Sequence, residues 1–160
     1  MKNITKLLVA LSFAIISTQA GAFEFKDMYV ATDIEEGITA EEVDESIKQL
    51  SISEGILHVA MFPLYKQVEA VTGKPYRHLS IHNLCDAKTA AVLADVSDAF
   101  VIVMPCRIAV VEGLDGKIRM WSMNSEMITA MEMPPEAKEL AEAVAAKMDN
   151  IISGAAEGAF

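Results

Sequence analysis

Apolar residues recur at helical spacing in an early part of the chain. Val43 and Ile47 stand four residues apart, which puts them on the same side of a helix. Thr39 precedes them and Glu42 follows it three residues later, an arrangement in which the two side chains satisfy each other's free backbone amides. Gly55 is a typical helix end. The pattern therefore predicts a helix that begins after Thr39 and ends before Gly55.

Alternation with a period of two predicts a strand over residues 77–83. Leu79 and Ile81 point to one side of this strand, and three polar residues point to the other. The polar residues are His78, Ser80 and His82. This alternation is typical of a strand with one buried face, and the polar side can be the solvent side. Apolar segments at 24–35 and 56–62 predict two further strands.

The most apolar run beyond the N-terminus is FVIVMPCRIAVV, residues 100–111. It predicts a long buried strand that continues to Glu112. Pro105, Cys106 and Arg107 stand side by side within it. A proline inside a strand usually marks a bulge or an edge, so we expect one of these at Pro105.

The remaining segments complete an α+β pattern. The Asp115-Gly116 pair is a strong hairpin signal, with residues 117–123 as the returning strand. Further helices are expected over residues 64–72, 87–96 and from Pro134 to about Gly154. Because strands and helices alternate only partly and the hairpin is antiparallel, we expect a single α+β domain. Its antiparallel sheet would be covered on one face by the two longer helices.

The first 22 residues have the pattern of a signal peptide. Lys2 and Lys6 make a basic start, the apolar run LLVALSFAII follows, and Ala20-Gly21-Ala22 fits a cleavage site. The apolar run is short for a bilayer span. We therefore expect residues 1–22 to be removed and residues 23–160 to form one domain exported to the periplasm.

Charge restricts the partners. The chain has 13 basic and 23 acidic residues, and removing residues 1–22 takes away two lysines and no acid, which leaves a net charge of −12. Nucleic acid and anionic lipid both require a basic surface, so neither is expected as a partner. We predict no cofactor and no membrane span in the mature form. A small ligand or a protein is the expected partner, and a homodimer is left open.

Cys85 and Cys106 are the two cysteines of the chain. They stand 21 residues apart, so neither a C-x-x-C redox motif nor a haem attachment motif is present. In an oxidising compartment the pair favours a structural disulfide, which would contribute roughly 3 kcal/mol in the chain-entropy model. Two free thiols with a function, or two unconnected buried cysteines, are the alternatives.

His82 and Met104 add borderline and soft ligands beside the cysteines, a set of the kind that suits copper or haem iron. The spacing matches no recognised zinc or copper site, so we predict no metal and favour a structural or solvent role for the histidines. Five methionines within residues 120–133 favour packing or an apolar ligand pocket over a metal relay.

Arg107 is unusual within a hydrophobic strand, because a buried guanidinium needs a partner. We favour an ion pair with an acid such as Glu112. A position at a sheet edge and an anionic ligand are the alternatives.

The segment around the hairpin resembles a known family. Pro105, Arg107, Ile108, Val110 and Glu112 stand in the order P-x-R-[IV]-x-V-[YV]-E, and the Asp-Gly turn with a short strand follows. This pattern is similar to the family called domain of unknown function 302, over most of the mature chain. The resemblance implies a TATA-binding-protein-like fold, a curved antiparallel sheet with helices packed on one face, and it implies no catalytic residues. The chain looks like an exported, cysteine-bearing branch of that family.

The sequence names no reaction and leaves enzymatic activity undecided. It shows no Ser-His-Asp signature, phosphate loop, H-E-x-x-H or paired-carboxylate motif. We expect a small exported binding or accessory protein whose ligand, sulfur- or metal-related, lies near Cys85, Cys106, His82 and Arg107. A thiol-dependent redox or sulfur-transfer enzyme is one alternative, and a disulfide-stapled structural or interaction domain is the other.

Overall fold

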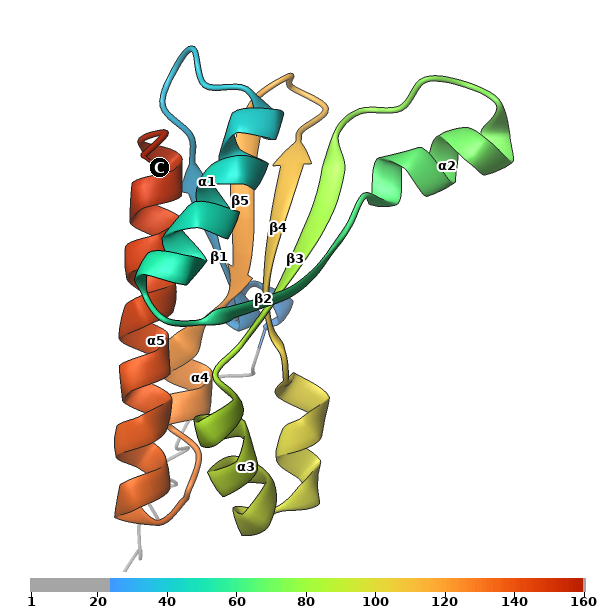
Figure 1. Cartoon of the computed structure of the whole chain (residues 1–160). Helices are drawn as coiled ribbons and strands as arrows, with labels where there is room; N and C mark the ends of the chain where they lie inside the picture. The colour runs from blue at the N-terminus through green and yellow to red at the C-terminus, as the bar shows by residue number, and fades with distance from the viewer. Residues whose placement is uncertain (1–23, 160) are drawn as a thin grey trace, which may run out of the picture.

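The structure is a computed structural model that describes residues 24–159. Its centre is one open sheet of five antiparallel strands in the order β1-β5-β4-β3-β2 (Figure 1). The strands are β1 (Tyr29–Asp33), β2 (Leu57–Phe62), β3 (Leu79–Cys85), β4 (Cys106–Glu112) and β5 (Ile118–Met123). The predicted signal peptide, residues 1–22, lies outside the described residues.

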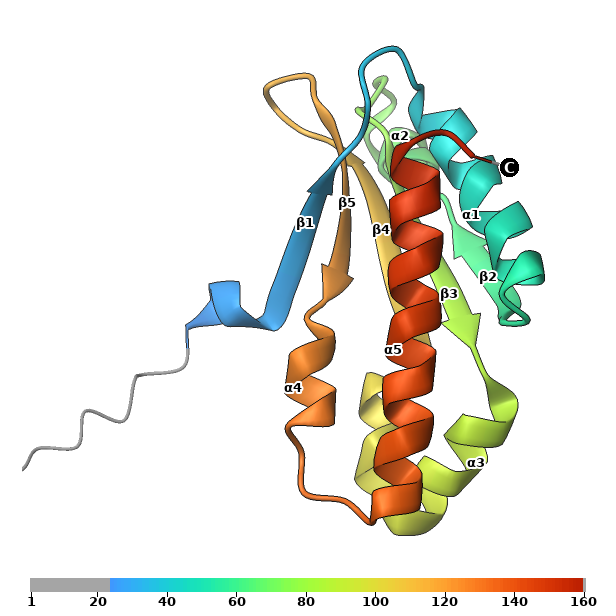
Figure 2. The same ribbon diagram turned by 90° about the vertical axis from the view of Figure 1, so that its left-hand side faces the viewer.

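The two longest helices, α1 and α5, pack against the same face of the sheet and against each other (Figure 2). α2 projects away from the body on the side of β2 and β3, and the other helices gather beyond one end of the strands (Figure 1). The helices are α1 (Ala40–Ser53), α2 (Leu64–Thr72), α3 (Ala87–Val96), α4 (Ser125–Thr129), α5 (Pro135–Ala156) and two 3-10 helices, η1 (Phe25–Met28) and η2 (Asp98–Val103). The predicted single α+β domain, with its helices on one side of an antiparallel sheet, is confirmed. No helix of the described part of the chain combines the length and the apolar character that a membrane crossing needs.

α1 begins as the sequence predicts. The Thr39 hydroxyl accepts a hydrogen bond from the Glu42 amide (3.2 Å), and the Glu42 carboxylate accepts one from the Thr39 amide (2.7 Å). Such a cap typically contributes about 1 kcal/mol to stability. The cap starts the helix in a register that turns Val43 and Ile47 toward the sheet, where both are fully buried.

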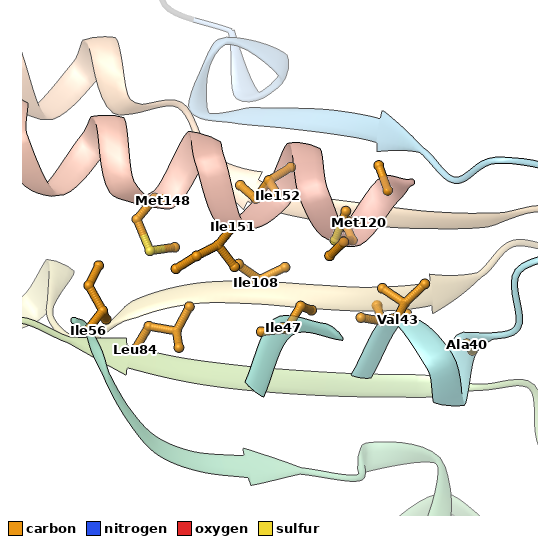
Figure 3. Close-up of a cluster of buried hydrophobic side chains, with 13 residues drawn as sticks. Ala40, Val43, Ile47, Ile56, Leu84, Ile108, Met120, Met148, Ile151 and Ile152 are labelled. Carbon is orange, nitrogen blue, oxygen red and sulfur yellow. The ribbon is translucent and has the colours of Figure 1, made fainter. Parts of the chain in front are cut away.

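The main core fills the space between the sheet and the pair α1 and α5 (Figure 3). Its buried members include Leu84, Ile108, Val110 and Met120 from the strands, Val43 and Ile47 from α1, and Met148, Ile151 and Ile152 from α5. Each fully buried aliphatic side chain of this size contributes about 1.5–3 kcal/mol relative to an exposed one. Interdigitated side chains therefore hold both helices to this face.

The predicted hairpin is confirmed. β4 and β5 pair from Ile108 opposite Ser122 to Glu112 opposite Ile118. Gly116 lies in the turn with a φ of 74°, a conformation that favours glycine because it has no Cβ.

The predicted long strand before the hairpin is wrong in its first half. Asp98–Val103 forms η2, and β4 starts only at Cys106, so Pro105 precedes the strand rather than bulging it. Phe100 is buried in a second, smaller core that α3 and α5 complete. A short apolar run is compatible with either a buried strand or a helical turn, and its packing partners decide between them.

The alternation in β3 is confirmed, but its polar side faces the core. Ser80 and His82 have no exposed surface (0 % each), and His78 is also buried. Leu79 and Ile81 lie on the opposite, open face of the sheet, where they are half-buried. Of the two roles favoured for the histidines, the solvent role is therefore wrong and the structural role agrees with their burial, because Asp44 of α1 provides a hydrogen-bond partner for this side of the strand.

Candidate functional site

A cavity of about 110 Å³ lies at the end of the strands, between β3, β4, α3 and α5. Most of its wall is apolar, and the wall includes Leu84, Leu93, Val103, Val144, Met148 and Ile152. These side chains come from segments far apart in the sequence. The cavity therefore exists only once the sheet end, α3 and α5 have packed together.

Both cysteines line this cavity, but they form no disulfide. Cys85 ends β3, and Cys106 begins β4. The predicted disulfide is therefore absent, and the strand register explains why. Cys106 lies opposite Leu84 and not opposite Cys85, so the two cysteines are not a directly facing pair of the ladder.

The Cys106 thiol is not activated. Burial raises its pKa, and the neighbouring Cys85 raises it further, against smaller lowering effects from a backbone hydrogen bond and from Arg107. The thiolate is the nucleophilic form of cysteine, so a raised pKa keeps Cys106 in its unreactive form near neutral pH. Its surroundings are those of a buried, polarisable group in an apolar wall.

Arg107 also lines the cavity, but its predicted ion pair with Glu112 is wrong. The Glu112 carboxylate instead accepts a hydrogen bond from the backbone amide of His78 (3.1 Å), and the Glu112 carbonyl accepts one from the Arg77 guanidinium. Arg107 is exposed. A solvated guanidinium needs no internal partner, so the reason for expecting the pair disappears.

His82 lies away from the cavity, in a buried polar cluster around Asp44 of α1. Its Nε2 is 2.8 Å from Asp44 Oδ1, and its Nδ1 is 2.9 Å from Nε2 of His58 on β2. Ser80 donates a hydrogen bond to the same Asp44 oxygen. Because an ionised carboxylate only accepts, His82 donates from Nε2 to Asp44, and in its neutral form it accepts at Nδ1 from His58. Asp44, His82 and His58 form a chain of hydrogen bonds that runs from α1 in the interior to β2.

His78 completes the cluster, so all three histidines of the chain gather around one carboxylate. Its Nε2 lies 3.1 Å from Asp44 Oδ2 but outside hydrogen-bond geometry, and its Nδ1 lies 3.6 Å from Glu41. The Tyr65 ring of α2 stacks on the His78 ring at 4.8 Å. Among the described residues, no three His, Cys, Asp or Glu side chains converge in a way that would hold a metal ion.

Two pKa values respond to this cluster. Burial alone would raise the pKa of Asp44, but the hydrogen bonds from His82 and Ser80, with the nearby histidines, outweigh burial and lower it. Burial lowers the pKa of His58, and the neighbouring His82 lowers it further. The cluster therefore favours an ionised Asp44 and a neutral His58.

Sequence reasoning missed Asp44 and His58. A signal for Asp44 was present, because Ala40, Asp44 and Ile47 share one helical face, and an acid on an apolar face needs a buried partner. No comparable signal marked His58, which lies on an edge strand beside a register shift. Of the predicted site residues, the structure brings Cys85, Cys106 and Arg107 together at the cavity and places His82 elsewhere.

The packing role predicted for the methionines of residues 120–133 is confirmed for Met120, Met123 and Met133, whereas Met131 is exposed. Met120 is buried in the main core, and Met104, Met123 and Met148 line the cavity. Thioethers fill irregular apolar space well, because the side chain is flexible and polarisable. They give the cavity a wall that is both apolar and soft.

Comparison with known proteins agrees with this fold. A crystal structure of an uncharacterised DUF302 protein from Bacillus stearothermophilus superimposes with a TM-score of 0.66 at 16% identity, covering 79% of this chain and 96% of that chain. No curated protein has a significantly similar sequence. The model of the family "Domain of unknown function DUF302" matches residues 30–155. That match spans most of the chain and agrees with the motif around the hairpin, and the chain therefore belongs to the DUF302 family.

Proposed function

We propose that this protein is an exported binding protein whose site is the apolar cavity beside Cys85 and Cys106. The observation that carries the proposal is a cavity of about 110 Å³ with an almost wholly apolar wall. Apolar cavities of roughly 150 Å³ stay dry and bind benzene. The ligand would therefore be an apolar molecule, or an apolar group, of about benzene's size or slightly smaller.

The wall indicates which apolar groups fit best. A protonated thiol from Cys106 and thioethers from Met104 and Met148 face the same small space. Sulfur is polarisable and makes favourable contacts with aromatic rings and with other soft atoms. The ligand class we propose is accordingly a small aromatic or sulfur-containing molecule.

The two alternatives from the sequence receive less support. A thiol-dependent enzyme needs an accessible thiolate, and the raised pKa of Cys106 works against one. A disulfide-stapled structural domain needs a disulfide, and both cysteines are free. A binding function needs only the cavity.

Export to the periplasm is part of the proposal and rests on the first 22 residues. Mass spectrometry of the protein purified from the producing cell checks it. We expect a mature N-terminus at Phe23 and two unmodified thiols. An N-terminus at Met1 in a cytosolic fraction would contradict export without touching the cavity.

Ligand binding is tested with benzene and dimethyl sulfide as probes, followed by NMR of methyl-labelled methionine. We expect the Met104 and Met148 methyl signals to shift and saturate as the probe is added. Ala145→Leu should abolish the shifts, because Ala145 lines the cavity and a larger side chain fills it. Ala143→Leu is the matched control, since Ala143 lies two residues earlier on the exposed side of α5.

Saturable shifts of the methionine signals that Ala145→Leu removes and Ala143→Leu preserves would support the site. Absence of saturable shifts with both probes in the unmodified protein, or shifts that Ala145→Leu leaves intact, would overturn it. Circular dichroism of both variants confirms that each is folded.

A further inference from the structure

A continuous apolar row crosses the open face of the sheet from one edge to the other. Its members lie opposite one another on neighbouring strands in the order Ala31, Trp121, Ala109, Ile81 and Phe62. Leu79 opposite Val111 and Tyr29 opposite Met123 extend the apolar surface along the strands. No α-helix within residues 24–159 lies on this face, where only the short 3-10 helix η1 stands beside the start of β1, whereas α1 and α5 cover the other face (Figure 2). The middle of this face is therefore apolar and has no α-helical cover, while Arg107 opposite Asn83 and the ion-paired Arg119 and Asp33 lie on the same face toward the ends of the strands.

The segment after β2 is apolar too, and the body buries it only in part. We call residues 63–77, which comprise α2 and the loop after it, the arm; it projects from the β2–β3 side (Figure 1). α2 has no fully buried residue, Val71 is 87% exposed, and Tyr76 is also exposed. The Tyr65 ring stacks on His78, but a helix this short is marginal with so little packing, so the arm is expected to pack against something outside the monomer.

The two edges of the sheet carry opposite charge. The arm beside β2 has three basic residues and one acid, a net charge of +2, in a chain that is strongly acidic. The opposite edge, residues 24–36 around β1, has five acids and one lysine, a net charge of −4. This β1 edge also exposes Phe25 and Val30. Each edge therefore combines exposed apolar side chains with a charge that complements the other edge.

We propose that two copies of this chain pack the open faces of their sheets together, about a two-fold axis in the interface that runs along the strands. This axis exchanges the two edges, so the arm of each copy lies beside the β1 edge of its partner. Both charge-complementary contacts then form at once, as a closed two-fold assembly requires. An axis across the strands would instead place the β1 edge of one copy beside the β1 edge of the other. Two acidic edges side by side repel each other, which is unfavourable.

The available area supports a role for the arms. Five strands about 4.8 Å apart and about six residues long give a face of roughly 24 by 20 Å, or about 500 Å². Stable interfaces bury roughly 800 Å² on each partner. The sheet face alone falls short of that value, and the arm and the β1 edge add the remaining surface.

Sedimentation equilibrium of the purified protein tests the proposal. We expect a dimer whose dissociation constant rises with salt, because part of the attraction is between exposed charges. Ala109→Glu, in the centre of the apolar row, and Val71→Glu, on the arm, should each raise the dissociation constant at least tenfold. Ile52→Glu is the matched control and should have no effect, because Ile52 is 71% exposed on α1, away from both surfaces.

A charge exchange tests the axis. Lys66→Glu with Lys74→Glu should weaken the dimer, and adding Glu35→Lys with Glu36→Lys at the opposite edge should restore it. A monomer at all concentrations in low salt would overturn the proposal. So would a dimer that neither Ala109→Glu nor Val71→Glu weakens, and a dimer without the charge rescue would overturn this axis. Val71→Glu decides if Ala109→Glu fails to fold, since Val71 contributes almost nothing to the monomer.

Discussion

The two faces of the sheet differ in burial, and the polarity of their residues does not predict which face is the more buried. The face under α1 and α5 buries Ser80 and His82 completely, together with Ile108, Val110 and Met120. The open face carries a row of five apolar residues that remain partly exposed. In β3 the more polar side is thus the more buried one.

Hydrogen-bond partners account for the difference. A buried polar group is costly only when it is unpaired, and Asp44 of α1 pairs with both Ser80 and His82. The aliphatic side of β3 is not covered by an α-helix of the described part of the monomer. Contact with a second copy would bury it. The comparison teaches that a strand's buried side follows from what packs against it, and not from its apolar residues alone.

Truncating one side chain on each face of the sheet should give the largest difference in the free energy of unfolding between the two faces. Ile108→Ala leaves a cavity in the main core and should lower the free energy of unfolding by about 3–4 kcal/mol. Ile81→Ala, on the neighbouring strand but the open face, should cost less than about 1 kcal/mol in the monomer. Urea unfolding at low protein concentration and high salt measures both. Equal losses would show that the open face is not open.

Removing the carboxylate from the polar cluster should have the next largest effect. Asp44→Ala takes away the acceptor for Ser80 and His82 in a buried site and should cost about 2–3 kcal/mol. Glu45→Ala is the matched control on the exposed side of the same helix and should leave the free energy of unfolding almost unchanged. A cost for Asp44→Ala no greater than the control's would mean that the cluster does not stabilise the fold.

The smallest expected effect is a dependence of stability on pH. The pKa of His58 is lowered in the fold from 6.5, so the unfolded chain takes up that proton first as the pH falls. Stability should therefore decrease as the pH drops below about 6.5, by at most about 0.5 kcal/mol because the imidazole is partly solvated. The lowered pKa of Asp44 adds a further loss only below about pH 4.

Urea unfolding of the unmodified protein and of His58→Gln from pH 7 to pH 3 separates the two effects. The variant should lose part of the pH dependence between pH 7 and pH 5 and keep the loss below pH 4. An unchanged profile would indicate that His58 has the same pKa in the folded and unfolded chains.

The candidate site was predictable in part. The sequence predicted a ligand near Cys85, Cys106 and Arg107, and all three line the cavity. It placed His82 there too, which is wrong, because Asp44 draws the imidazole into a separate cluster. The cavity itself was beyond prediction, since segments from residue 84 to residue 152 must pack before it exists.

The amino-acid sequence by itself determined the features that depend on neighbours along the chain. The capping box at Thr39 and Glu42, the Asp115-Gly116 hairpin and the alternation in β3 all rest on contacts within a few residues. The motif around the hairpin, which is also local in the sequence, indicated the family that the family model then matched.

Only the tertiary structure decided the side on which β3 is buried, the helical start of the run at Phe100 and the absence of a bond between Cys85 and Cys106. Each of these depends on a contact between distant segments, such as the hydrogen bond that joins Asp44 to His82 across 38 residues. Local patterns carry no information about which distant group arrives, and that group decides whether a polar side chain can be buried.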